Sequence, residues 1–134
     1  MPSKLSYTVA PTLADIDQIA RRAVTRLPAE LKRFVADVVI QVEDFPDVEV
    51  EEDMDLDSPF DLLGLYQGVS LADKSSFHVA GQPDMIFLFR RPLLDYWCET
   101  GEDLEHLVRH VIIHEIGHHF GLSDDDMERI EDQV

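Results

Sequence analysis

Apolar residues recur every three to four positions between residues 12 and 27, which predicts an amphipathic helix over this segment. Thr12 precedes the first apolar position as a candidate N-cap, and Pro28 ends the run. Residues 28–34 predict a further short helical turn. The β-branched residues of the segment 37–42 then favour a strand, because such side chains fit a pleated sheet.

Two more apolar segments predict strands, a glycine-containing one at 62–69 and a strong one at 84–90. The polar residues 70–83 between them are typical of a loop. Pro92 suits the first position of a short helix that runs through Trp97. A helix, several strands and two C-terminal helices in this order predict an α+β fold with a small sheet.

An acidic segment separates the first predicted strand from the second. It self-repels and favours a solvated loop, although carboxylates could also gather around calcium. The segment lacks the residue order of an EF-hand loop, which makes calcium the weaker interpretation. Its nine carboxylates in fifteen positions are Glu43, Asp44, Asp47, Glu49, Glu51, Glu52, Asp53, Asp55 and Asp57.

Composition limits the function classes that remain. The chain has 134 residues, which fits a single domain over 1–134, and 45% of them are hydrophobic. Its 28 Asp and Glu outnumber 11 Lys and Arg, giving a formal net charge of −17. This charge argues against nucleic acid and against an anionic membrane surface as partners, because both require a basic face.

Targeting and redox signals are few. No apolar run approaches the roughly 18 residues that cross a bilayer, and residues 1–7 lack the features of a secretory leader. We therefore expect a cytoplasmic protein. Cys98 is the only cysteine, so no intrachain disulfide can form, and we expect it to be a buried small side chain.

Candidate chemistry lies on a predicted helix near the C-terminus, for which Thr100 is a plausible cap. The helix carries the sequence His-Glu-Ile-Gly-His at residues 114–118. His114 and His118 are four residues apart and therefore share one face, where both imidazoles can bind one zinc ion. Glu115 projects from the helix in a different direction from the two histidines, so it is placed to act as a general base rather than as a metal ligand.

A catalytic zinc ion requires a third protein ligand. Gly121 is a natural helix terminator, and Asp124 follows three residues later, so the stretch spells HExxHxxGxxD. Asp124 is the candidate third ligand, with Asp125, Asp126 and Glu131 as alternatives. His110 and His106 continue the four-residue spacing, but each step rotates away from the metal, so His110 is at most a neighbour of the site.

These motifs resemble the minimal zincins, a family of small bacterial predicted zinc metallopeptidases with a domain like that of matrix metalloproteases. The resemblance rests on the segments 61–68, 83–91 and 114–127, and the last resembles the metzincin signature with Asp in place of the usual third His. It implies His114, His118 and Asp124 as zinc ligands and Glu115 as catalytic base.

The same resemblance implies a zincin-like α+β fold. We expect a small mixed sheet, about three main helices and a cleft between the sheet edge and the active-site helix. Metzincins also have a methionine-bearing turn under the metal. Met127 is the only methionine after the motif, and it serves either that role or ordinary packing in a terminal helix.

The leading hypothesis is a zinc metalloendopeptidase, in which zinc activates water and Glu115 takes its proton. A peptide or protein substrate would pair with a free sheet edge, at 62–69 or at 84–90. Tyr66 is a possible extra oxyanion donor. The alternatives are a catalytically weak or inactive metal-binding domain with structural zinc, and a hydrolase of non-peptide amides.

Overall fold

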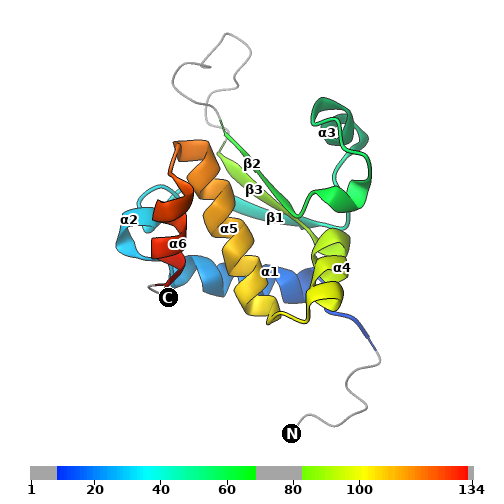
Figure 1. Ribbon diagram of the computed structural model, residues 1–134, viewed down its shortest axis with the longest axis horizontal. Coiled ribbons are helices and arrows are strands. Elements are labelled where there is room, and N and C mark those ends of the chain that lie inside the picture. Colours follow the sequence, from blue (N-terminus) through cyan, green and yellow to red (C-terminus); the bar gives the residue numbers. More distant parts are fainter. Residues whose placement is uncertain (1–8, 69–82, 133–134) are drawn as a thin grey trace, which may run out of the picture.

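The computed structural model describes residues 9–68 and 83–132, and Figure 1 shows how its elements are arranged. The predicted polar loop at 70–83 lies almost entirely outside these residues. The chain order is α1 (Leu13–Thr25), α2 (Ala29–Lys32), β1 (Val39–Glu43), α3 (Val48–Asp53), a 3₁₀ helix η2 (Pro59–Asp61), β2 (Gly64–Gln67), β3 (Met85–Phe89), α4 (Arg90–Thr100), α5 (Leu104–Phe120) and α6 (Asp124–Asp132).

The first predicted helix is confirmed together with its cap. The Thr12 hydroxyl accepts the Asp15 N–H, and the Asp15 carboxylate accepts the Thr12 N–H. This capping box satisfies two backbone donors that a helix N-terminus otherwise leaves unpaired. Ile16, Ala20 and Ala23 form the buried stripe that the periodicity predicts.

A small mixed sheet has the strand order β1-β3-β2, with β1 parallel and β2 antiparallel to β3. The α+β fold class with a small mixed sheet is therefore confirmed. Because β3 is central, the segment 84–90 has both of its edges paired. No strand within the described residues pairs with the outer side of β2, so Gly64–Gln67, within the predicted segment 62–69, is a free edge beside α5.

The alternation of hydrogen-bonded and outward-facing residues along β2 shows which backbone groups face that free edge. Leu63 O accepts the Phe89 N–H at 3.0 Å, so the odd-numbered residues of this segment bond to β3. In an antiparallel ladder the intervening residues turn their N–H and C=O groups outward. Gly64 and Tyr66 therefore present their backbone groups at the free edge.

The core lies on one face of the sheet, where α5 packs against β2 and against α1 (Figure 1). Tyr66, Ile86 and Leu88 point into it from the strands. Gly64 lets α5 approach closely, since a β-carbon there would lie 2.7 Å from Val111 Cγ1. This close contact places the HExxH helix directly beside the free edge of β2.

Helix α6 packs against α5 through Met127, which is completely buried. A β-carbon on Gly117 would lie 2.1 Å from Met127 Sδ, so only glycine leaves room for this contact. Met127 thus lies in a helix rather than in a turn. Its contact with Gly117 fixes α6 beside the HExxH segment.

Some local predictions are wrong. Cys98 is exposed rather than buried, because it lies on the outer side of α4. The acidic segment contains the six-residue helix α3 instead of a continuous loop. Asp103, not Thr100, caps α5 by accepting the His106 N–H, while Thr100 is the last residue of α4 and its hydroxyl donates to Tyr96 O.

No helix within residues 9–68 and 83–132 is both long enough and apolar enough to span a lipid bilayer.

Candidate metal centre

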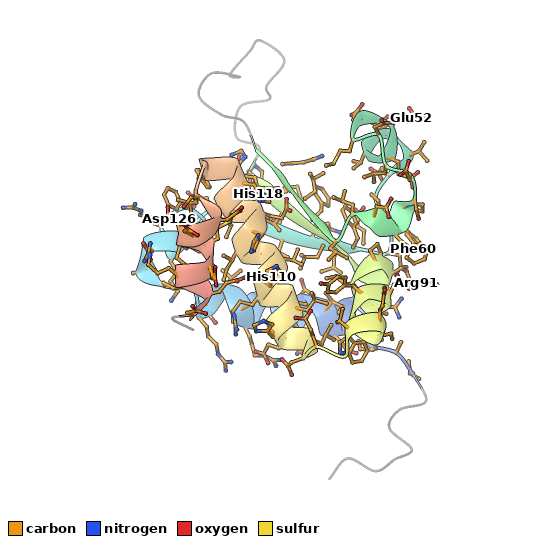
Figure 2. The ribbon with its side chains drawn as sticks, viewed as in Figure 1. Glu52, Phe60, Arg91, His110, His118 and Asp126 are labelled. Atoms are coloured by element: carbon orange, nitrogen blue, oxygen red, sulfur yellow. The ribbon has the colours of Figure 1, made fainter. Side chains whose placement is uncertain are left out.

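The candidate site lies on α5 and the helix that follows it, and Figure 2 shows His110 and His118 on α5 with Asp126 on α6. Val108, Ile112 and Ile116 anchor α5 in the core with no exposure to solvent. The helix ends at Gly121, whose φ of 75° is left-handed and favours glycine. The chain then reverses, and Ser123 caps α6 through Asp126 N–H.

Three histidines are stacked along α5. The ring centroids of His110 and His114 are 4.1 Å apart, and those of His114 and His118 are 5.8 Å apart with nearly perpendicular rings. The four-residue spacing therefore does place His114 and His118 on one side of the helix, as predicted. It places His110 even closer to His114.

Glu131 joins this row from the last turn of α6. Its Oε1 lies 2.5 Å from His110 Nδ1 and 3.6 Å from His114 Nε2. Within the described ranges, these three residues are the one group whose potential ligand atoms all lie within 4.8 Å of one another. The sequence offered Glu131 as an alternative ligand and His110 as a neighbour, but it did not connect the two.

The predicted third ligand, Asp124, is the exposed first residue of α6. It lies near enough to His114 for its negative charge to act on the histidine's pKa. The ligand atoms of His114, His118 and Asp124 are nevertheless not gathered as closely as those of His110, His114 and Glu131. His118 is also exposed, so both side chains have room to reorient.

Burial lowers the pKa of His114, and the neighbouring His110 lowers it further. Glu131 and Asp124 act in the opposite direction, while His118 adds to the lowering. The net effect favours the neutral imidazole. This is the form that binds a metal ion, because a protonated nitrogen has no free electron pair.

Glu115 lies at the free edge of the sheet. Its Oε1 accepts the outward-facing N–H of Tyr66 at 3.1 Å. Burial raises the pKa of the Glu115 carboxyl, against smaller opposing effects of this hydrogen bond and of His118. A carboxylate with a raised pKa is a better proton acceptor near neutral pH.

The side chain of Tyr66 contacts His119, the residue that follows His118 on α5. Its ring stacks on His119 with centroids 4.0 Å apart, and its hydroxyl donates to Asp84 Oδ2 at 2.8 Å. Burial and Asp84 together raise the pKa of the phenol. The hydroxyl is thus bound to Asp84 rather than free to serve as the extra oxyanion donor that the sequence suggested.

These residues suit a divalent transition metal. Imidazole and carboxylate are zinc ligands, and the buried Glu131 Oε1 has His110 Nδ1 close by but makes no aligned hydrogen bond. A buried, unsatisfied carboxylate oxygen is costly unless a cation or donor compensates it. The donors on α5 and α6 therefore fit the kind of metal ion that the motif predicts.

Comparison with known proteins also indicates a metal-dependent peptidase. The sequence profile of a family described as zincin-like metallopeptidase matches residues 35–134, which include all of the candidate site residues. The chain belongs to this family of zincin-like metallopeptidases. None of the curated proteins matches the chain significantly.

Proposed function

We propose that this protein is a zinc-dependent endopeptidase with Glu115 as its general base and His114, His118 and Asp124 as metal ligands. The observation that carries the proposal is the position of Glu115, a half-buried carboxylate of raised pKa beside His118 and at the free edge of β2. Family membership supports a zinc peptidase in the coarser sense. The spacing of His114, His118 and Asp124 supports the ligand set.

Zinc, when bound, supplies a Lewis acid that polarises the scissile carbonyl and increases the acidity of water. The chain supplies the proton transfer. Glu115 accepts a proton from the attacking water and then donates it to the nitrogen of the leaving amine. The raised pKa of Glu115 suits both steps, because the carboxyl must gain and lose a proton within one catalytic cycle.

The free edge of β2 provides a place for an extended peptide. Gly64 and the Tyr66 carbonyl present outward backbone groups there, and a peptide can pair with such groups as an additional strand. Glu115 binds the Tyr66 N–H, so a peptide at this edge would lie within reach of the catalytic carboxylate. This proximity favours a peptide over a small amide as substrate.

A structural role for the metal is the second candidate. The observation in its favour is that His110 and His114 on α5 meet Glu131 on α6, so an ion at this point would tie the two helices together. Such an ion would contribute directly to folding stability. The same experiment addresses both candidates.

The test is digestion of a general peptide library by the zinc-loaded protein, with cleavage products identified by mass spectrometry. We expect new peptide termini with zinc and none after chelation, while circular dichroism shows that the chelated protein stays folded. The variant His106→Ala, which alters an exposed histidine outside the site, is the matched control. Unfolding on chelation with no cleavage in any sample would instead support structural zinc.

A further inference from the structure

We propose that His110, His114 and Glu131 form a second cation-binding position, which shares His114 with the HExxH pair. This position goes beyond the proposed function, because neither His110 nor Glu131 belongs to its ligand set. The site joins one face of α5 to the last turn of α6. It differs from the proposed catalytic ligand set in two of its three residues and has His114 in common with it.

The separations of Glu131 Oε1 from the two imidazole nitrogens, 2.5 Å and 3.6 Å, lie on either side of the spacing that a cation requires. Two ligands about 2.0–2.1 Å from a tetrahedral zinc ion lie about 3.3–3.4 Å from each other. Glu131 Oε1 and His114 Nε2 are 3.6 Å apart, close to this separation. Glu131 Oε1 and His110 Nδ1 are 2.5 Å apart. A side-chain rotation that moves these two atoms about 0.8 Å further apart would give them the separation of two zinc ligands.

The contact between His110 and Glu131 does not by itself satisfy the carboxylate. Although the two atoms are close, Glu131 Oε1 has no aligned hydrogen-bond donor and is shielded from solvent. The Glu131 side chain as a whole is only 16% exposed. An ion between the three residues would compensate this oxygen and use the free electron pairs of both imidazoles.

The donor set selects the class of ion. Two imidazole nitrogens and one carboxylate oxygen suit zinc and neighbouring first-row divalent ions. Calcium and magnesium prefer sites built mainly from oxygen ligands. We therefore assign this position to a divalent transition metal rather than to an alkaline-earth ion.

Because both metal positions use His114, the HExxH pair and the second position compete for the same imidazole nitrogen. One nitrogen atom binds one ion, so an ion held through His114 Nε2 withdraws that nitrogen from the HExxH pair. The Met127–Gly117 contact packs α6 against α5, and this packing places Glu131 beside His114. A protein without its HExxH pair should therefore still bind zinc.

The test measures zinc affinity by competition with a chromophoric chelator, using His118→Ala alone and combined with Glu131→Gln. We expect His118→Ala to keep one equivalent of bound zinc. Adding Glu131→Gln should weaken that binding by more than about 100-fold, the upper range for loss of a supporting group. His118→Ala/His106→Ala is the matched control and should bind zinc as His118→Ala does.

The variants are chosen to preserve the fold, because His118 is exposed and Gln has the shape of Glu. Circular dichroism of each variant confirms this directly. Equal zinc affinity of His118→Ala with and without Glu131→Gln would overturn the second position and would show an ion pair only. That outcome leaves the proposed peptidase activity untouched, since the activity is judged by cleavage in the protein with an intact HExxH pair.

Discussion

The sulfur of Met127 lies 2.1 Å from the point where a β-carbon on Gly117 would stand. Gly117 lies between the two histidines of HExxH, and Met127 is fully buried on the following helix. This relationship places α6, with Asp124 at its start and Glu131 near its end, alongside the histidines of α5. The geometry of the candidate metal centre therefore depends on a glycine that carries no chemistry.

Gly117→Ala should destabilise the protein by about 1 kcal/mol. Alanine normally stabilises a helix interior by about 1 kcal/mol relative to glycine, but overpacking a core costs typically about 1–3 kcal/mol. We expect the cost of overpacking against Met127 to exceed the gain in helix propensity. Urea unfolding measures the resulting change in the free energy of unfolding. In a Met127→Ala background the overlap is absent, so the same change should be neutral or stabilising. Stabilisation by Gly117→Ala in the parent protein would contradict this packing.

Zinc should stabilise the folded protein, because only the folded chain brings the ligands together. At a free concentration of 100 times Kd, a ligand that binds only the folded state adds about 2.7 kcal/mol to the free energy of unfolding. Thermal unfolding with zinc and with chelator measures this difference. His114→Ala should abolish it, since His114 belongs to both proposed ligand sets. An unchanged response in His114→Ala would place the metal elsewhere.

Tyr66 should make stability fall at alkaline pH. Its pKa is raised in the folded state, so above the ordinary value of about 10 the folded chain holds a proton that the unfolded chain has lost. The stabilisation is complete below pH 10 and decreases as pH rises toward the raised pKa. Tyr66→Phe should cost about 1 kcal/mol at neutral pH through the lost hydrogen bond to Asp84.

The pH dependence is measured by urea unfolding between neutral pH and pH 11. Tyr66→Phe should show a shallower decrease above pH 10 than the parent protein. Tyr96→Phe, which alters an exposed tyrosine, serves as the control and should follow the parent. Identical slopes for the parent and Tyr66→Phe would contradict the role assigned to this phenol.

The charge of the chain should bias its substrate preference. The net charge is −17, and Asp124, Asp125 and Asp126 lie in the first turn of α6 beside the site. At about 0.01 M salt, where charges act over about 30 Å, kcat/KM should be at least about tenfold higher for basic than for acidic peptides. The ratio should approach one at about 1 M salt. Equal kcat/KM values for basic and acidic peptides at low salt would show that the charge of the chain does not select its substrates.

Local features of the fold could be predicted from the sequence. Helix α1 and its Thr12 cap depend on residues three or four apart, which the sequence displays directly. Helix α3 was missed because it is short and exposed, so its acidic residues resemble a solvated loop. Thr100 and Asp103 are both good capping residues three positions apart, and only the length of α4 decides between them.

The candidate site was predictable to the extent that it lies on one helix. His114, Glu115 and His118 follow from spacing within α5, whereas the approach of Glu131 to His110 depends on how α6 packs. That packing is set by the fit of Met127 against Gly117, a contact between two elements that no local pattern reveals. The signal available in the sequence was the spacing of His110 and His114, which repeats that of His114 and His118.

The most direct test of the central claim compares the parent protein with Glu115→Gln at equal, measured zinc content on the same peptide library. Glutamine keeps the size of the side chain but cannot accept a proton from water. We expect Glu115→Gln to bind zinc as the parent does and to lose cleavage by at least about 100-fold, the lower range for general acid–base catalysis. Equal cleavage by Glu115→Gln and the parent would contradict Glu115 as the general base.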